Sequence, residues 1–216
     1  MKKLVFGVGI NDSLVKVFSY KELTRKENGK RNRIRECCPF YKKWQQMLAR
    51  CYSEAYKKRF PTYENCKVVD EWIYFSNFKA WMETQDWEGK ELDKDILFPG
   101  NKIYGPETCV FVTSRVNYFM LDCGASRGLW PIGVSFHKRI KKFAANCSSY
   151  KESRLVFLGY YNTPEEAHQA WLEYKIKQAY LLAEDLDDTR VSQAIIKRYE
   201  NYGSSSLLGL YSDAVD

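Results

Sequence analysis

Histidine, paired cysteines and long apolar runs are scarce in this sequence, and each scarcity disfavours a class of protein. Only two histidines occur among 216 residues, which leaves few imidazoles for catalysis or metal binding. No two cysteines have the spacing typical of zinc ligands, so no zinc is expected; convergence of Cys37, Cys51 and Cys66 on a metal is a minor alternative. No run reaches the roughly 18–20 apolar residues that would cross a membrane. We therefore expect a soluble, cytoplasmic protein without a membrane partner.

The overall composition predicts a folded protein with reduced thiols. Seven cysteines are an odd number, and the first residues predict a strand rather than a secretory signal, so a disulfide framework is not expected. Apolar residues make up 45% of the chain and aromatic residues 16%, which is enough to build a hydrophobic core. A disordered tail is thereby excluded. A length of 216 residues fits one large domain or two small ones.

Basic residues outnumber acidic ones and are concentrated in two blocks. The chain has 34 Lys and Arg against 27 Asp and Glu, a net charge of +7. Residues 21–60 hold 13 basic and four acidic residues, and residues 127–154 hold seven basic residues and one acidic residue. Such blocks suit a polyanionic partner, because each phosphate that is neutralised releases counterions. A solvated basic surface is the alternative, whereas a DNA-mimicking inhibitor would be acidic and is disfavoured.

The first half of the chain predicts a hairpin followed by helices. Residues 1–20 alternate in part and are expected to form a hairpin around Asn11 and Asp12, while residues 21–36 predict a basic loop that is mobile without a ligand. After Pro39, apolar residues at helical spacing predict one buried face: Tyr41, Trp44, Met47, Leu48 and Cys51. A second helix is expected after Val68, with a core-packing aromatic stripe: Trp72, Phe75, Phe78 and Met82.

The second half of the chain predicts strands and helices in alternation. Residues 92–97 and 108–112 are expected to be strands joined by a polar loop and followed by a short helix that ends at Leu121. Three further strands are expected over residues 133–137, 143–147 and 155–161. Thr163, Pro164 and Glu166 predict a capped helix start. The sheet-facing side of this helix is expected to be Ala167, Ala170, Trp171, Tyr174 and Ala179. A helix over residues 191–199 is expected to be peripheral.

The C-terminal segments resemble the AP2 DNA-binding domain. Arg127-Gly128, GVSFHKRIKKFAANC and LGYYNTPEEAHQAW follow that family's pattern over about 60 residues. The resemblance implies a three-stranded sheet packed on a helix, with the sheet in the major groove of double-stranded DNA. The residues expected to contact DNA are Arg127, Ser135, His137, Lys138, Arg139, Lys141, Lys142 and Arg154. Plant members carry arginines and a tryptophan at several of these positions, so phosphate binding is expected more than base readout.

The middle segment is similar to the HNH, or ββα-metal, endonucleases, especially the phage homing type that pairs this module with an AP2 domain. That family places Asp-His at a strand end, Asn in the next loop, and His or Asn in a following helix. Here Asp93-Lys94, Asn101 and Asn117 occupy those places. The resemblance implies catalysis by Asp93, Lys94, Asn101 and Asn117, and Mg²⁺ or Mn²⁺ held by Asp93 and Asn117 with Asp95 nearby.

Lys94 is the main departure from this family. The family's histidine polarises water, which suits a neutral imidazole, whereas a lysine is a poor base unless its pKa is depressed. A lysine can still stabilise a pentavalent phosphate. Two functions therefore stay open: a metal-dependent endonuclease or nickase, and an inactive DNA-docking scaffold or phage host-interaction or anti-defence factor with a host protein partner. An ordinary solvated turn at residues 93–95 is the structural alternative.

Together these segments predict an α+β fold in four parts. Residues 1–36 are expected to form the hairpin and the basic loop. Residues 37–123 are expected to form aromatic-rich helices that lead into the ββα-metal-like module. Residues 124–186 are expected to form the AP2-like three-stranded antiparallel sheet with its helix. Residues 187–216 are expected to form a C-terminal helix and an acidic tail. If a phage encodes the chain, its cytoplasm is that of the host.

Overall fold

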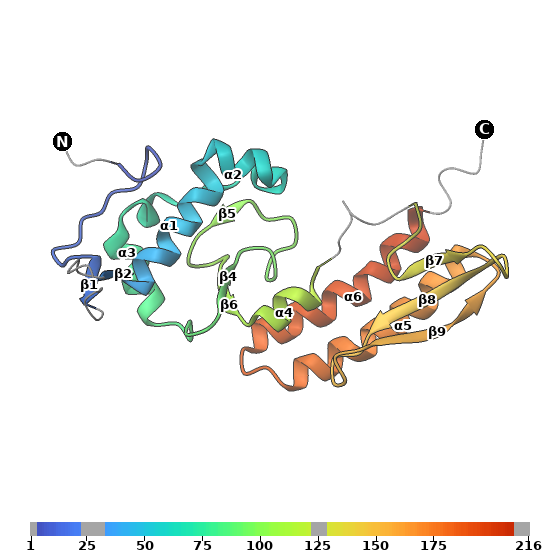
Figure 1. The fold of residues 1–216 in the computed structure, drawn as a ribbon. Coiled ribbons are helices and arrows are strands. Elements are labelled where there is room, and N and C mark those ends of the chain that lie inside the picture. Colours follow the sequence, from blue (N-terminus) through green and yellow to red (C-terminus); the bar gives the residue numbers. More distant parts are fainter. Residues whose placement is uncertain (1–3, 23–32, 122–128, 210–216) are drawn as a thin grey trace, which may run out of the picture. The chain divides into compact units, whose positions relative to one another are not determined.

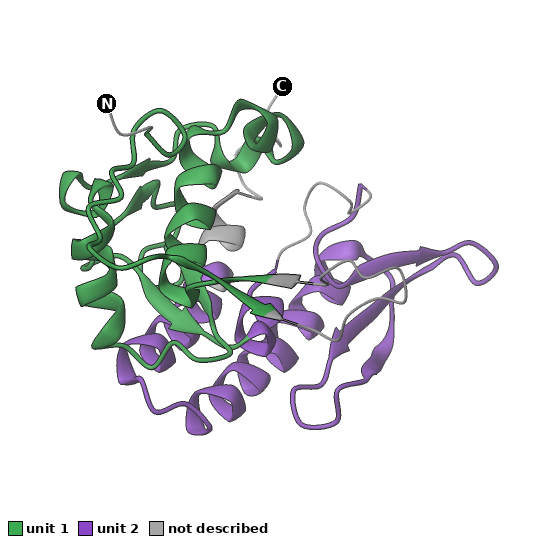
Figure 2. Cartoon of the chain, turned by 60° about the vertical axis from the view of Figure 1, so that its left-hand side comes forward, with its two compact units in different colours: residues 1–113 green, residues 114–216 purple. Residues whose placement is uncertain are grey.

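A computed structural model describes residues 4–22, 33–121 and 129–209. This part of the chain contains six α-helices and nine strands in four small sheets, which confirms the α+β class (Figure 1). The chain divides into two compact units, residues 1–113 and residues 114–216 (Figure 2). The division precedes the boundary predicted at residue 123, which lies outside the described residues. No helix within the described ranges combines the length and apolarity that a membrane span requires.

Helices with one apolar face form the centre of the first unit. α1 (Pro39–Tyr52) starts with a proline, whose missing N–H costs no helical hydrogen bond at that position. Its buried residues are those that the sequence predicted: Tyr41, Trp44, Met47, Leu48 and Cys51. α2 (Glu54–Arg59), which the sequence analysis missed, has no buried residue. After two 3₁₀ turns, η1 (Pro61–Tyr63) and η2 (Asp70–Ile73), α3 (Phe75–Glu83) contributes Phe75, Phe78 and Met82 to the core.

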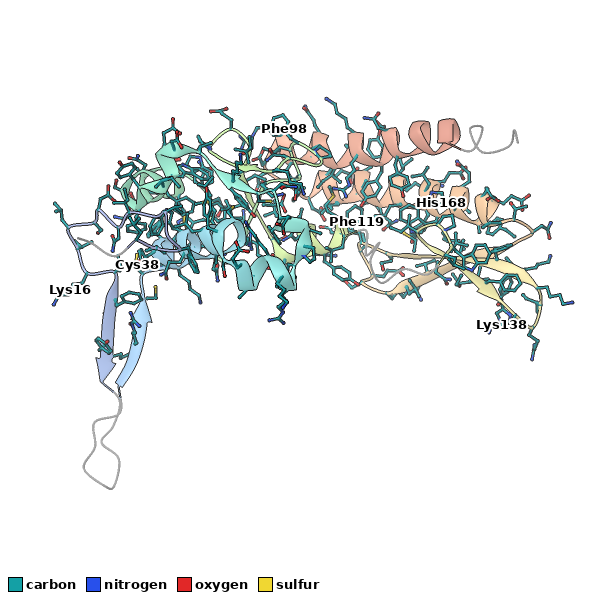
Figure 3. All side chains as sticks on the ribbon, turned by 90° about the horizontal axis from the view of Figure 1, so that it is seen from above. Lys16, Cys38, Phe98, Phe119, Lys138 and His168 are labelled. Carbon is teal, nitrogen blue, oxygen red and sulfur yellow. The ribbon has the colours of Figure 1, made fainter. Side chains whose placement is uncertain are left out.

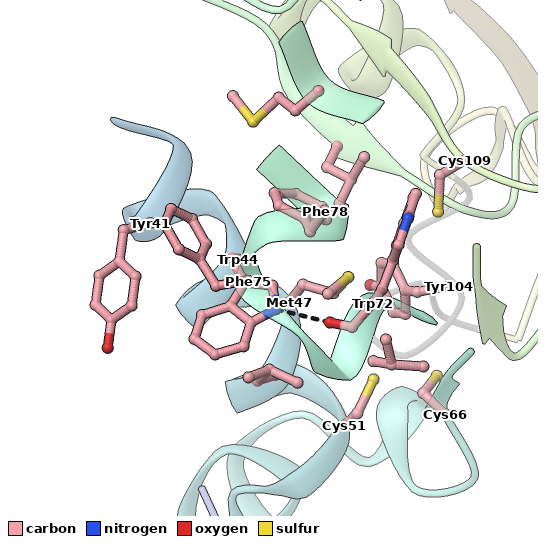
Figure 4. Close-up of a cluster of buried hydrophobic side chains, with 14 of the residues drawn as sticks. Tyr41, Trp44, Met47, Cys51, Cys66, Trp72, Phe75, Phe78, Tyr104 and Cys109 are labelled. Carbon is pink, nitrogen blue, oxygen red and sulfur yellow. Dashed lines mark hydrogen bonds between the residues drawn. The ribbon is translucent and has the colours of Figure 1, made fainter. Parts of the chain in front are cut away.

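Two tryptophans anchor the core of the first unit. Trp44 in α1 and Trp72 in η2 are 0% and 2% exposed. The indole Nε1 of Trp44 donates a hydrogen bond of 2.7 Å to the backbone carbonyl of Trp72, so the buried N–H has a partner (Figure 4). The rings of Tyr41, Trp44 and Phe75 contact one another, with centroid distances of 5.1 Å for Tyr41–Phe75, 5.4 Å for Tyr41–Trp44 and 5.5 Å for Trp44–Phe75. The predicted aromatic stripe is therefore a packed core.

The N-terminal hairpin lies later in the chain than the sequence predicted. β1 (Phe18–Glu22) and β2 (Arg33–Cys37) pair antiparallel, and the intervening residues 23–32 lie outside the described ranges. Asp12, an expected turn residue, accepts a hydrogen bond of 2.9 Å on Oδ1 from the backbone N–H of Ser76 in the first turn of α3. Because a carboxylate in this place caps a helix N-terminus, Asp12 anchors the segment to α3. The prediction of a hairpin around this residue was wrong.

Short strands complete the first unit. β3 (Lys67–Val68) pairs parallel with β5 (Ile103–Tyr104), and β4 (Glu91–Asp93) pairs antiparallel with β6 (Val110–Val112). β4 is shorter than predicted, because the chain turns after Asp93. Oδ1 of Asp93 accepts hydrogen bonds from the backbone N–H groups of Asp95, at 2.7 Å, and Ile96, at 2.8 Å.

The second unit is a three-stranded sheet with helices on one side. It begins with α4 (Ser114–Phe119), and the sheet has the order β7 (Val134–His137), β8 (Lys142–Ser148), β9 (Leu155–Tyr161). All its pairs are antiparallel, and the three strands match the predicted ones closely.

α5 (Pro164–Glu184) starts with the predicted capping box. Thr163 Oγ1 accepts from the Glu166 N–H at 3.2 Å, and the Glu166 carboxylate accepts from the Thr163 N–H at 3.3 Å. Of the predicted sheet-facing stripe, Ala167, Trp171 and Ala179 are buried, whereas Ala170 and Tyr174 are half-buried.

The last helix belongs to the core of the second unit. α6 (Thr189–Gly209) packs along α5, and three of its apolar residues, four positions apart, are 2%, 0% and 5% exposed: Val191, Ile195 and Tyr199. Spacing of four places these side chains on one helical face. The prediction that this helix is peripheral was therefore wrong.

Candidate nucleic-acid interface

The sheet of the second unit has one covered face and one open face. α5 packs against the face of β8 that carries Ala145 and Cys147, which are 0% and 3% exposed. Because successive side chains of a strand point to opposite faces, the alternate residues lie on the open face. His137 on β7 pairs with Lys142 on β8, and both are exposed on this face together with Ser135.

A basic turn joins β7 to β8 at one end of the open face. Its cationic side chains are all exposed: Lys138, Arg139 and Lys141, followed by Lys142 at the start of β8. None of these four has an acidic partner among the residues that the structure describes. Lys141 closes the turn with a left-handed φ of 51°, and Lys138 extends from the tip (Figure 3). Four adjacent cations without partners create a local positive potential that attracts phosphate.

Of the predicted contact residues, Arg154 lies away from the basic turn and Arg127 cannot be placed. Arg154 lies in the turn between β8 and β9, at the opposite end of β8 from Lys142. Its Nε donates a hydrogen bond to Oε2 of Glu152, which offsets the charge. Arg127 lies outside the described residues. The structure therefore brings together six of the eight predicted residues: Ser135, His137, Lys138, Arg139, Lys141 and Lys142.

The open face also carries two aromatic side chains that the sequence analysis missed. Phe157 and Tyr160 on β9 are 53% and 45% exposed, and their ring centroids are 4.8 Å apart. The Tyr160 ring meets the His137 ring edge on at 5.5 Å. A row of rings thus extends from β9 toward the basic turn, and such rings can pack against sugars or the methyl groups of thymines.

A β-bulge explains why these rings were missed. Ala145 pairs with Gly159, but the next residue, Asn146, pairs with Phe157, so one residue of β9 is left over. Strict alternation would have placed Phe157 and Tyr160 on opposite faces. The one local signal was Gly159 inside an otherwise apolar strand, because an isolated glycine in a strand is typical of a bulge.

The start of β7 is held against α5 by His168, the second histidine. His168 Nδ1 lies 2.9 Å from the backbone oxygen of Ile132, and its ring stacks on Trp171 with centroids 5.4 Å apart. Gly133, with φ of 82°, passes so close to Trp171 that an added Cβ would lie 2.0 Å from the indole. This histidine therefore positions the sheet and is separate from the basic turn (Figure 3).

Two of the predicted catalytic residues, Lys94 and Asn101, form a hydrogen-bonded cluster with Asp95, which we call the Lys94 clasp. The Lys94 side chain is 5% exposed, and its Nζ donates to both carboxylate oxygens of Asp95, at 2.6 and 2.7 Å, and to the backbone oxygen of Asn101 at 2.7 Å. The Asn101 amide in turn donates to the backbone oxygens of Lys94 and Ile103, at 2.9 and 2.7 Å. These bonds close the loop between β4 and β5.

The residues predicted to hold a metal are divided between the two units. Asp93 is half-buried at the end of β4, and its Oδ1 already accepts two backbone N–H bonds. Asn117 is half-buried in α4 and belongs to the second unit. Among the described residues, no three His, Cys, Asp or Glu side chains form a group that could hold a metal ion.

The buried cysteines are poorly suited to bind metal. Burial and, to a smaller extent, the neighbouring Cys66 raise the pKa of the Cys51 thiol to about 12. A metal requires the thiolate, which is scarce near neutral pH when the pKa is raised so far. Cys51 and Cys66 lie together in the core of the first unit, where they pack as small apolar groups.

Comparison with known proteins found no relative: no protein-family model, no curated protein and no solved structure matches this chain.

Proposed function

We propose that this chain is a double-stranded DNA-binding protein that binds through the open face of the second unit's sheet. The observation that carries the proposal is the basic turn, in which four cations lie beside an open strand face and have no acidic partner within the described ranges. An exposed sheet face of this size suits the major groove, which admits a β-ribbon. The three-stranded sheet on a capped helix is the arrangement that the AP2 resemblance implies.

Different residues of this surface would contact different parts of DNA. The Lys138, Arg139, Lys141 and Lys142 cations would bind phosphates and position the sheet, without reading sequence. Ser135, His137 and Asn146 would face base edges, where hydroxyl, imidazole and amide groups can form hydrogen bonds. The Phe157 and Tyr160 rings would add apolar contact. Affinity would therefore come mainly from the basic turn, and selectivity from the strand residues.

For the first unit, we propose a docking role in preference to catalysis. The Lys94 ammonium has its donors engaged by Asp95 and Asn101, so it faces the protein rather than a substrate. The alternative is an HNH-like endonuclease or nickase in which Asp93 and Asn117 hold Mg²⁺ or Mn²⁺. Nicking of a supercoiled plasmid by the wild type with either ion, and its loss in Asp93→Ala, would establish that alternative.

Nothing in the described residues favours a host-protein partner as strongly as the basic turn favours DNA. Trp44, Trp72, Phe75 and Phe78 of the first unit are buried in its core and are not available to such a partner. The exposed aromatic side chains of the described first unit are Phe6, Tyr20, Phe60, Tyr74 and Phe98. A DNA-binding chain of this kind would act in the cytoplasm, and in that of the host if a phage encodes it.

The proposal is tested by neutralising the basic turn. Lys138, Lys141 and Lys142 are changed together to Ala, and affinity for duplex DNA is measured by fluorescence anisotropy at fixed salt. We expect a loss of at least about tenfold, because up to three phosphate contacts disappear. The matched control changes Lys177, Arg190 and Lys197 to Ala, since these exposed cations lie on α5 and α6. Equal losses in the two variants would show that the open face is not the contact surface.

A further inference from the structure

The second unit contains a cavity that the proposed function does not use. Its volume is about 570 Å³, within the range of small-molecule sites. α4, the β8–β9 turn and α5 contribute its walls. β7 pairs with β8 as far as Ala145, and the N–H of Asn146 donates a hydrogen bond of 2.8 Å to the backbone oxygen of Gly133. Beyond this point the edge of β8, at Cys147 and Ser148, lines the cavity together with Asn146. The cavity therefore lies at a strand edge that β7 leaves uncovered.

The charged groups that line this cavity are all cationic. Arg115, Arg154 and Lys175 line it, and no Asp or Glu among the described residues does so. Arg154 is partly neutralised by Glu152, which lies outside the lining. Arg115 donates to the backbone oxygen of Tyr150 and lies 4.0 Å over its ring, and it forms no ion pair within the described part of the chain. The pKa of Asp185, a carboxylate outside the lining, is lowered mainly by its bond to Lys151 and in smaller part by the charge of Arg115. A ligand with a negative charge would neutralise the cations of this lining.

Lys175 is the most deeply buried of these cations. The residue is 8% exposed, and its Nζ makes one hydrogen bond, of 2.9 Å, to the backbone oxygen of Phe119. The ammonium also lies 3.3 Å from the centroid of the Phe119 ring. An ammonium has three N–H donors, so this arrangement leaves donor capacity beside the cavity. Burying a cation without an anion is costly, and an anionic ligand would relieve that cost.

The remaining lining suits a planar organic group. Aromatic side chains from three elements contribute to it: Phe119 from α4, Tyr150 from the β8–β9 turn and Trp171 from α5. Hydroxyl and amide groups lie among them: Asn146, Ser148, Ser149 and Ser153. Apolar walls with a few polar groups are typical of ligand sites, where the polar groups fix orientation. The combination of rings, hydroxyls and cations matches a base joined to a phosphate.

We propose that this cavity is a binding site for a nucleoside monophosphate group, with the phosphate near Lys175 and Arg115 and the base among the aromatic walls. Two sources share this chemistry: a free nucleotide, and a nucleotide extruded from bound DNA. The second source is considered because Asn146 and Leu155 line the cavity and also belong to the strands of the DNA-binding sheet. Only this second source rests on the proposed function.

The site is tested first without DNA. Calorimetric titration of the full chain with AMP should give a Kd below about 1 mM, with adenosine and inorganic phosphate each binding at least about tenfold more weakly. Lys175→Met should weaken AMP binding by about tenfold or more. Lys177→Met, an exposed lysine on the same helix, should leave it unchanged. Absence of AMP binding to the wild type, or equal binding by Lys175→Met, would overturn the free-nucleotide site.

Two further experiments provide a second variant and distinguish the two nucleotide sources. If Lys175→Met fails to fold, Ser148→Trp, which fills the cavity and keeps Lys175, should abolish AMP binding. For the DNA source, a duplex containing 2-aminopurine should brighten on binding, and Ser148→Trp should suppress this without loss of affinity. AMP binding without brightening assigns the site to free nucleotides. If DNA does not bind at all, the AMP titration still decides the site, and absence of both signals overturns the proposal.

Discussion

Lys94 illustrates how burial decides the role of a residue whose position in the sequence indicates chemistry. Its place after Asp93 matches the catalytic histidine of the HNH resemblance, yet its side chain is 5% exposed and bound to Asp95 and to the backbone oxygen of Asn101. A cation held by three short hydrogen bonds is an efficient cross-link for a loop. The same residue type at the same sequence position is thus better explained by stability than by attack on a phosphodiester.

Removing the Lys94 clasp should therefore unfold the first unit more readily. We expect Lys94→Ala to lower the free energy of unfolding by about 2–3 kcal/mol, less than for a fully buried ion pair because the Asp95 side chain is 45% exposed. Urea unfolding of the full chain measures this. Lys67→Ala, at an exposed position on β3, is the control and should change little. Equal stability of the two variants would remove the structural role assigned to Lys94.

Lys175 gives the second unit a characteristic pH dependence. The pKa of Lys175 is lowered from 10.5 to about 8, mainly by burial; Cys147 partly counters this effect and Arg198 adds to it. Between those two pH values the unfolded chain keeps the proton that the folded chain has lost, so this group makes the folded state more stable as pH rises. From pH 8 to 10, the wild type should gain up to about 3 kcal/mol relative to Lys175→Met.

The comparison with Lys175→Met isolates this one group. Cysteine and tyrosine side chains are common to both proteins, so their contributions largely cancel in the difference. Cys147 is the exception, because the charge of Lys175 lowers its burial-raised pKa in the wild type alone. Guanidinium unfolding at several pH values provides the measurement. If the difference in unfolding free energy between the wild type and Lys175→Met stays constant with pH, the buried lysine titrates like an exposed one.

At the scale of elements, local chemistry predicted the second unit better than the first. The Thr163–Glu166 capping box and the three strands depend on neighbours in the sequence, and the structure contains them nearly as predicted. β1 and β2 carry charged residues and no clear apolar alternation, so their pairing depends on tertiary contacts such as Phe18 against Tyr41, with ring centroids 5.6 Å apart. Contacts of that kind are not visible in a sequence window.

The candidate site shows the same limit. The basic turn follows from the sequence, because adjacent cations in a turn remain exposed whatever surrounds them. The exposed rings of Phe157 and Tyr160 did not follow, since the bulge at Ala145 and Asn146 changes which side chains share a face. Likewise, Val191 and Ile195 were recognised as helical, but their burial depends on α5 as a packing partner.

The contact between β7 and α5 should be sensitive to a single methyl group. Gly133→Ala combines a left-handed φ of 82° with a Cβ 2.0 Å from Trp171. We expect it to lower the unfolding free energy by about 2–4 kcal/mol, from backbone strain plus overpacking. Gly100→Ala is the control. Its φ is 78°, but a Cβ added there would meet no atom within 4 Å apart from its chain neighbours, so only the backbone strain of about 1–2 kcal/mol remains. Thermal unfolding distinguishes the two variants, and a Gly133→Ala protein as stable as the control would contradict the close packing.

At the scale of the whole molecule, the two basic blocks of the sequence belong to different units. Residues 21–60 lie in the first unit, where α2 exposes Lys58 and Arg59. Residues 127–154 lie in the second unit and include the basic turn. Each unit has its own buried core, so each can present its charge on a stable scaffold. A chain of this design is expected to bind DNA mainly through phosphates, with a strong response to ionic strength.

The salt dependence of duplex DNA affinity tests this account most directly. Affinity of the full chain is measured from roughly 50 to 300 mM salt, for the wild type and for the variant with Lys138, Lys141 and Lys142 changed to Ala. If the four cations of the basic turn each bind a phosphate, log affinity should fall with log salt at a slope of about −4 or steeper, and the variant's slope should be shallower by about 2–3. A flat response in the wild type, or identical slopes in both proteins, would contradict DNA binding through the basic turn.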